Sequence, residues 1–224
     1  MLGILSKIDR GLAQKVSANI GVAVPKKTGQ LNFSVPADAD PKSYDSVIVK
    51  SSLERSAALS MADTPKDSIA TRKIAFLIAD GVSAQSVAAA KKAIEAAGAV
   101  VELIAPKLGA VKTDGKQTLN PDKRLANAAS VLYDAVFVPG GGKSIAALCN
   151  EADAIHFLNE AFKHCKAIGA DADAQTLLDR TYFADKVGQD PGLIAGGKNN
   201  VRLFINATAQ HRFWEREKPR MVPA

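Results

Sequence analysis

Four short, nearly continuous apolar runs constrain the fold of this chain more than any other feature. They cover residues 73–79, 100–104, 135–138 and 166–170. An uninterrupted apolar run is typical of a strand buried on both faces, whereas alternating residues indicate a strand with one wet face. A helical pattern over 83–97, which Gly98 would end, separates the first two runs. Because strands and helices alternate, we predict an α/β domain with a mainly parallel, doubly wound sheet.

Weaker patterns complete this prediction, and together they indicate a flavodoxin-like fold over residues 73–218. An Asp114-Gly115 pair predicts a type I′ turn in a small hairpin over 111–119. A long terminal helix is predicted over 201–216, where Phe204, Ala207, His211 and Trp214 recur at helical spacing. The other expected elements are helices over 122–130, 144–149, 152–165 and 175–180, and an edge strand over 192–196.

The first 72 residues differ from the rest of the chain in composition and in hydrophobic pattern. Leu12, Val16 and Ile20 recur every four residues and predict an amphipathic helix within 3–20. Asp9 is a candidate N-cap for this helix, and Gly21 would end it. Prolines then punctuate a polar stretch with little periodicity, which is typical of an extended arm. We therefore predict three parts: a helix in 1–21, a linker arm in 22–72 and the α/β domain in 73–224.

Composition excludes several functional classes. The chain has 29 basic and 23 acidic residues, a net charge of +6, and the basic residues are scattered, so we do not expect nucleic-acid binding. No window approaches the length of an apolar membrane span, and no export signal is visible, so we expect no membrane association and a cytoplasmic location. Two cysteines, Cys149 and Cys165, are too few for a disulfide framework and are predicted to be buried free thiols.

Ligands of doubly wound sheets bind beyond the carboxyl ends of the strands. Residues 80–84, 139–143 and 169–173 should meet there. Gly140, Gly141 and Gly142 follow a strand and can turn backbone N–H groups toward an anion, although a tight turn without a ligand explains them equally well. Gly142-Lys143-Ser144 is similar to the end of a phosphate loop, but Phe137 stands where that loop needs glycine.

Residues 167–178 predict a buried strand, a sharp turn and a helix, which is the local structure that presents a catalytic nucleophile in some α/β enzymes. The turn offers Asp171. This carboxylate is either a nucleophile, which would need a base and oxyanion donors, or part of an acidic turn in which Asp171 or Asp173 caps the next helix. No histidine lies in the turn. His156 and His164 are eight residues apart and His211 is remote, all on predicted helices, so we predict no metal site.

The framework of residues 73–218 resembles the PfpI-type, amidotransferase-like superfamily. Those enzymes carry a cysteine at the turn and an acidic residue just after the first strand. In this chain the cysteine position falls at Asp171, and the acidic position falls within Ser83-Ala84-Gln85-Ser86, near Ala84. Neither residue is retained. The resemblance therefore implies a degenerate site with no catalytic residue, and it argues against protease, glyoxalase or deglycase activity.

A narrower resemblance covers almost the whole chain. Residues 8–21, 31–36, 209–214 and 222–224 resemble, in this order, the C-terminal part of large-subunit haem catalases. That family decomposes hydrogen peroxide with haem, whose iron is held by a tyrosine with arginine four residues before it. Tyr44, Tyr133 and Tyr182 lack such an arginine, so the resemblance implies haem in the parent catalase and no cofactor in this part of it.

Two hypotheses follow from these resemblances. The first is a non-catalytic domain whose partners are the haem domain and the sister subunits of a catalase tetramer, which it stabilises; it would also act as a holdase for unfolding client proteins. The alternative is residual PfpI-type hydrolase or glyoxalase activity carried by Asp171, Cys149 or Cys165. Cys165 precedes the fourth strand and would lie at the wrong end of the sheet for this role.

Overall fold

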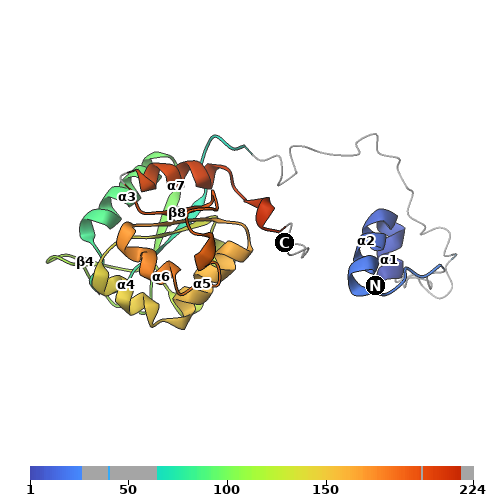
Figure 1. Cartoon of the computed structure of the whole chain (residues 1–224), viewed down its shortest axis with the longest axis horizontal. Helices are drawn as coiled ribbons and strands as arrows, with labels where there is room; N and C mark the ends of the chain where they lie inside the picture. Colours follow the sequence, from blue (N-terminus) through green and yellow to red (C-terminus); the bar gives the residue numbers. More distant parts are fainter. Residues whose placement is uncertain (27–39, 41–64, 198, 218–224) are drawn as a thin grey trace. The chain divides into compact units, whose positions relative to one another are not determined.

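A computed structural model describes residues 1–26, 40, 65–197 and 199–217 of the chain. The chain divides into two units, Met1–Arg55 and Ser56–Ala224. Figure 1 shows the helices of the first unit in blue and the α/β domain of the second in colours from green to red. Most of the predicted linker arm, residues 22–72, lies outside the described residues.

The first unit holds two helices where the periodicity predicted one. α1 spans Leu2–Ile8 and α2 spans Arg10–Ile20, and they are separated by Asp9, whose backbone is extended. The prediction that Asp9 caps a helix is confirmed, because its Oδ1 accepts a hydrogen bond from the Leu12 N–H at 2.9 Å. Gly21 ends α2 with a φ of 69°, as predicted. Ala13 is the one buried residue of this helix pair, while Ile8 is 78% exposed.

The second unit contains a six-stranded parallel sheet, which confirms the predicted fold class. The strand order is β5-β2-β1-β6-β7-β8, so the chain reverses its direction of winding between β1 and β6. All neighbouring strands pair in parallel. The strands are β1 (Lys73–Leu77), β2 (Val100–Ala105), β5 (Lys123–Arg124), β6 (Ala135–Val138), β7 (Ala167–Ala170) and β8 (Leu193–Ala195).

Helices cover both faces of this sheet (Figure 1). On one face, α3 (Ala84–Ala96) and α7 (Asn200–Ala209) pack on a core built around the Phe76, Phe137 and Phe204 rings, whose centroids lie 5.2 and 5.3 Å apart. The other face carries α4 (Gly142–Cys149), α5 (Ala152–Lys163) and α6 (Gln175–Leu178). Each buried phenylalanine contributes on the order of 2–3 kcal/mol through the apolar area it removes from water. Because helices cover both faces of the sheet, the central strands present apolar side chains to both of these layers.

Two local predictions are wrong. The hairpin pairs β3 (Val111–Lys112) with β4 (Thr118–Leu119), but Gly115 does not adopt positive φ and residues 113–117 form a longer connection. The reason is tertiary, since Asp114 donates its N–H to the Val82 carbonyl and accepts from the Ala84 N–H at the start of α3. The helix expected over 122–130 is replaced by β5 and by two 3₁₀ turns, η4 (Leu125–Asn127) and η5 (Ser130–Leu132).

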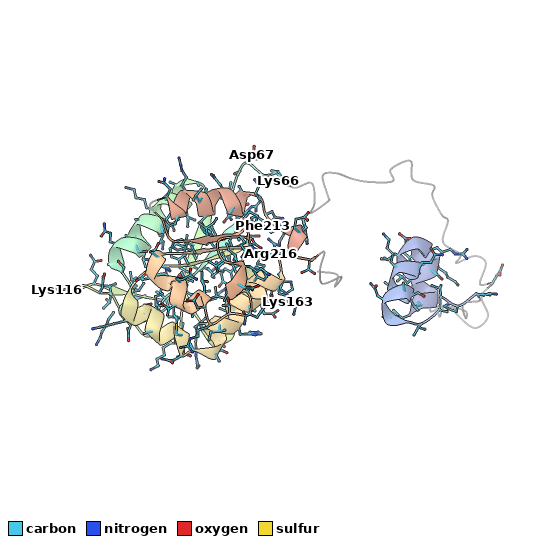
Figure 2. All side chains as sticks on the ribbon, viewed as in Figure 1. Lys66, Asp67, Lys116, Lys163, Phe213 and Arg216 are labelled. Atoms are coloured by element: carbon cyan, nitrogen blue, oxygen red, sulfur yellow. The ribbon has the colours of Figure 1, made fainter. Side chains whose placement is uncertain are left out.

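The terminal helix is shorter than predicted. α7 ends at Ala209, and His211 adopts a left-handed φ of 69°, which turns the chain back toward the sheet. The Phe213 N–H then donates to the Cys165 carbonyl at 2.8 Å, and Trp214–Arg216 form the 3₁₀ turn η8. Arg216 fastens this segment through paired 2.7 Å hydrogen bonds to Asp190; Figure 2 labels Arg216 and Phe213 side by side. Cys165 is buried as predicted, but Cys149 is partly exposed.

Candidate functional site

The three segments predicted to meet at the carboxyl edge of the sheet do meet there. The Ser83 N–H donates to the Gly140 carbonyl at 2.7 Å, which ties the loop after β1 to the loop after β6. The Gly140 N–H in turn donates to Oδ2 of Asp171, at the end of β7, at 2.8 Å. This junction lies at the switch point between β1 and β6, where doubly wound sheets place their ligands.

Asp171 is the centre of this junction. Its Oδ2 accepts from the Ser86 hydroxyl as well as from Gly140, and its Oδ1 accepts from the Asn200 side-chain amide at 2.5 Å. The two positions inferred for the degenerate site are therefore in direct contact, because Ser86 belongs to the 83–86 segment. Asn200, at the start of α7, was not anticipated from the sequence, and no local motif around it signals this contact.

The glycine N–H groups that were one candidate for holding an oxyanion are occupied by carboxylates of the chain itself. The Gly141 N–H donates to Oδ2 of Asp173 at 2.7 Å, beside the bond from Gly140 to Asp171. Gly141 is required by its backbone, since it adopts a φ of 128° and a Cβ would lie 2.5 Å from the Gly81 carbonyl oxygen. A Cβ on Gly140 would lie 2.7 Å from Asp173 Oδ1, so this carboxylate would have to move. Of the two interpretations of these glycines, the structure favours a turn whose N–H groups are satisfied internally.

The backbone at Asp171 is relaxed. Its φ of −72° and ψ of 165° lie in the ordinary extended region, unlike the strained turn that raises a catalytic nucleophile above a sheet. The following residues form the 3₁₀ turn η6 (Ala172–Ala174) before α6, and the side chain of Asp171 makes no cap hydrogen bond to this turn. Asp171 therefore binds loops together and does not cap the next helix.

Neither cysteine is placed as a nucleophile. Cys165 precedes β7, at the opposite end of the strand from Asp171, and burial raises the pKa of its thiol to about 11 with a smaller effect from Glu217. The thiolate is the reactive form of cysteine, so Cys165 is inert at neutral pH. Cys149 is the last residue of α4, at the opposite end of this helix from the glycine-rich loop where it begins.

The similarity of residues 142–144 to a phosphate loop is not matched by geometry. The Ser144 hydroxyl is fully buried and accepts from the Ala79 N–H at 2.9 Å, so it cannot reach a metal-bound phosphate. Phe137, at the position that needs glycine, packs between the Phe76 and Phe204 rings in the core. Ser144 thus closes the end of β1 and carries no ligand function.

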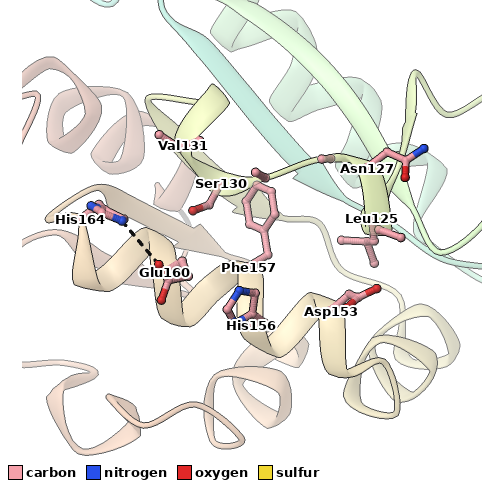
Figure 3. Close-up of a pocket in the computed structure, with 12 residues that line it drawn as sticks. Leu125, Asn127, Ser130, Val131, Asp153, His156, Phe157, Glu160 and His164 are labelled. Carbon is pink, nitrogen blue, oxygen red and sulfur yellow. Dashed lines mark ion pairs between the residues drawn. The ribbon is translucent and has the colours of Figure 1, made fainter.

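His156 and His164 line a separate cavity of about 410 Å³ between α5 and the η4–η5 segment. Figure 3 shows the two rings on one face of α5, with the Nε2 of His164 3.5 Å from Oε2 of Glu160. His211 lies elsewhere, after α7. Within the described ranges, no three histidine, cysteine or acidic side chains are grouped so as to hold a metal ion.

The described tyrosines do not fit a haem ligand. The Tyr133 hydroxyl donates to Oε2 of Glu102 at 2.6 Å, and burial together with this carboxylate raises the pKa of the phenol well above its usual value. Tyr133 therefore stays protonated and cannot supply a phenolate to iron. Tyr182 packs edge-on against Phe162 and Phe183. Tyr44 lies outside the described residues.

Comparison with known proteins decides the family. Residues 70–218 match the family described as the C-terminal domain found in long catalases. The chain belongs to this family. The match confirms the second resemblance drawn from the sequence, and it places the junction around Asp171 at the carboxyl edge of the sheet in a long-catalase C-terminal domain.

Curated relatives are full catalases. The chain is 34% identical to catalase HPII of Pseudomonas aeruginosa and 37% identical to catalase HPII of Pseudomonas putida, covering 99% and 96% of this chain but 28% and 27% of those proteins. Catalase-B of Dictyostelium discoideum is 31% identical over 99% of this chain and 30% of its own length. The long-catalase C-terminal domain described here thus spans less than a third of the curated relatives that it matches.

Among solved structures, the chain is similar to a two-domain protein of Anabaena variabilis that contains DJ-1/ThiJ/PfpI-like and ferritin-like domains. The identity is 21% and the TM-score 0.48, over 52% of this chain and 33% of that one. In the described part of the long-catalase domain, no helix is both long and apolar enough to cross a bilayer. The cytoplasmic location and the lack of nucleic-acid binding stay predictions.

Proposed function

We propose that this chain is the non-catalytic C-terminal domain of a long catalase and that it stabilises the assembly of the haem-bearing, peroxide-decomposing part. One observation carries the non-catalytic assignment. The edge where a related enzyme would bind substrate is closed by Asp171 and Asp173, which take the hydrogen bonds of Gly140 and Gly141. A substrate oxyanion would have to displace two carboxylates before any chemistry began.

The helix pair supports a docking role. α1 and α2 bury only Ala13, and Ile8, Leu12 and Ile20 are 78, 47 and 57% exposed. An isolated pair of short helices gains little stability in water, so its apolar face gains most by packing on another surface. Because the relatives continue beyond this chain, we propose that the surface on which the helix pair packs belongs to the haem-bearing part of the catalase or to a sister subunit.

The test is complementation in trans. Catalase HPII of Pseudomonas putida is truncated so that it lacks the region matching this chain, and the chain is added back before heating. We expect a longer half-life of peroxide decomposition and recovery of the oligomer in sedimentation velocity. The variant Ile8→Gln should lose this effect, whereas Lys15→Gln, a polar change on the same helix pair, should retain it. No protection by the unaltered chain would refute the stabilising role.

The proposed holdase activity rests on exposed apolar side chains in the α/β domain. Val131, Leu132 and Leu108 are 70, 52 and 61% exposed. Such surface binds unfolding chains when it is contiguous. The chain should therefore suppress the aggregation of insulin after its disulfides are reduced, and the double variant Val131→Ser with Leu132→Ser should suppress it less. Unchanged light scattering at several-fold molar excess would remove the holdase role and leave the stabilising role intact.

A further inference from the structure

A second cluster of charged side chains lies at the amino ends of the strands, opposite the junction around Asp171. Arg72 directly precedes β1, Asp134 precedes β6, Lys166 precedes β7, and Arg212 follows α7. A cavity of about 460 Å³ opens here, and its polar lining comes from Ser68, Thr71, Arg72, Asp134 and His211. Nothing in the proposed function uses this cavity.

The charges of this cluster do not balance. Asp134 is the one carboxylate that acts electrostatically on Arg72, Lys166 and Arg212 alike within the described chain. The Asp134 carboxylate also has partners other than these cations, because its Oδ2 accepts a hydrogen bond from the Lys73 N–H at 2.9 Å and its Oδ1 lies 3.9 Å from the His211 Nε2. Burial lowers the pKa of all three cations, that of Lys166 to about 8. At pH 7 the cluster therefore holds two more positive than negative charges in a partly desolvated place.

Polar atoms nearby also lack partners. Thr208 Oγ1 and His211 Nδ1 are buried and have no hydrogen bond to any part of the chain that the structure describes. Buried polar groups are normally paired, and an exception calls for a ligand, a bound water or a strained functional site. Arg72 has donor capacity left as well: its contacts are carbonyl oxygens, with Nη1 on Thr208 at 2.5 Å and Nη2 on Ala209 and Pro65 at 3.4 and 3.3 Å.

The backbone is strained at the same place. Among the described residues, three that are not glycine adopt a left-handed conformation: Thr71, Cys165 and His211, with φ of 66, 59 and 69°. Each directly precedes one of the three cations of the cluster. Such a conformation costs about 1–2 kcal/mol per residue and persists where the surrounding structure holds a ligand site in place. The three strained residues therefore fix the backbone directly before Arg72, Lys166 and Arg212.

We propose that this cluster is an oxyanion site that binds a phosphate group, either free or carried by a small organic molecule. Two negative charges would neutralise the surplus of the cluster. The Arg72 guanidinium lines the cavity with its charge and with the donors that the three carbonyl oxygens leave over, and the hydroxyls of Ser68 and Thr71 add donors on the cavity wall. The cavity is larger than a phosphate ion, which leaves room for a small organic group.

Calorimetric titration of the whole chain at pH 7 tests this site. Inorganic phosphate and glycerol phosphate are compared with sodium chloride at equal ionic strength, and the tighter phosphate ligand identifies the source. Arg212→Gln should weaken phosphate binding about tenfold, the usual effect of losing a charge-assisted contact. Asp134→Asn should tighten it several-fold, because it removes the repelling charge and keeps an oxygen that accepts from the Lys73 N–H. Lys116→Gln, in the β3–β4 loop on another side of the domain (Figure 2), is the matched control for a lost charge.

Two results would overturn the proposal. One is heat of binding no greater with either phosphate than with chloride. The other is phosphate binding that Arg212→Gln and Lys116→Gln weaken equally, since a diffuse effect of net charge predicts that pattern. If Arg212→Gln does not fold, as judged by circular dichroism, Asp134→Asn is compared with Asp179→Asn, because only a local oxyanion site predicts a larger gain in affinity from Asp134→Asn than from the same change at an exposed acid.

Discussion

At the scale of single residues, the Asp171 carboxylate joins segments that meet at the carboxyl edge of the sheet. Its donors come from three elements that are remote in sequence: Ser86 in α3, Gly140 after β6 and Asn200 in α7. Under the proposed function, Asp171 stands at the position of a nucleophile and acts as a tie between loops.

This tie predicts a measurable contribution to stability. Asp171→Ala removes the acceptor for the Ser86, Gly140 and Asn200 donors and leaves the Gly140 N–H only a longer, 3.3 Å hydrogen bond to the Ser86 hydroxyl, so we expect the free energy of unfolding to fall by about 2–3 kcal/mol. Asp179→Ala removes an exposed carboxylate that accepts one hydrogen bond from the Gln175 side-chain amide, and it should lower the free energy of unfolding by less than about 0.5 kcal/mol. Urea denaturation at 25 °C measures both. Equal losses in the two variants would show that Asp171 is an ordinary surface acid.

His211 gives the chain a specific pH dependence. Burial, reinforced by Arg212 and Arg72, lowers the pKa of its imidazole from 6.5 to about 4 in the folded state. The unfolded chain therefore binds a proton that the folded chain rejects, and the stability present above pH 6.5 is lost as the pH falls toward 4. The loss from this residue is on the order of 3 kcal/mol.

Two asparagine variants isolate this effect. His211→Asn should flatten the profile of unfolding free energy between pH 6.5 and 4, because asparagine does not titrate and tolerates the left-handed backbone at this position. His156→Asn, at an exposed position on α5, should leave the profile of the unaltered chain in place. A profile that is identical in the chain and in His211→Asn would mean that other groups cause the acid sensitivity.

At the scale of elements, the sequence predicts those whose stability is local or fully buried. The runs that became β1, β2, β6 and β7 were predicted correctly because, apart from Lys73 and Glu102, their residues are apolar, glycine or alanine and most of them are buried on both faces. The meeting of the three loops at the carboxyl edge also follows from topology alone. The end of α7 could not be predicted, because helical spacing continues to Trp214 while Phe213 finds the Cys165 carbonyl instead. Likewise, no sequence signal near Asn200 predicts its hydrogen bond to Asp171, which lies 29 residues earlier in the chain.

The turn η8 depends on one side chain. Arg216 is 5% exposed; it pairs with Asp190 through Nε and Nη2, donates to the Lys166 carbonyl and lies 4.3 Å from the Phe162 ring centroid. Arg216→Ala leaves the largely buried Asp190 carboxylate without its cation, with a hydrogen bond from the Gly192 N–H still in place, and should cost about 3–5 kcal/mol. Adding Asp190→Ala should cost less than the sum of the two single changes. Trp214 is the single tryptophan in the sequence, and its fluorescence reports release of η8. Additive losses would show that the two side chains are not coupled.

At the scale of the whole molecule, the two units differ in what holds them together. The buried apolar residues of the α/β domain run from Ile69 to Ala209, and its long-range contacts already involve residue 66, since the Gln210 side-chain amide donates to the Lys66 carbonyl. The helix pair has one buried residue, Ala13. Buried apolar surface is therefore concentrated in the second unit, whereas the helix pair by itself buries too little to be stable in water.

Deletion of residues 1–64 tests this division. The shortened chain should unfold cooperatively, with a midpoint temperature within about 2 °C of the whole chain, because a change of 1 kcal/mol shifts the midpoint of a domain of this size by about 2–4 °C. A peptide of residues 1–26 should be largely unfolded by circular dichroism, since short helices are marginal without tertiary packing. A midpoint lowered by more than about 5 °C would mean that the helix pair packs on the α/β domain, and that its exposed apolar face is not kept for a partner.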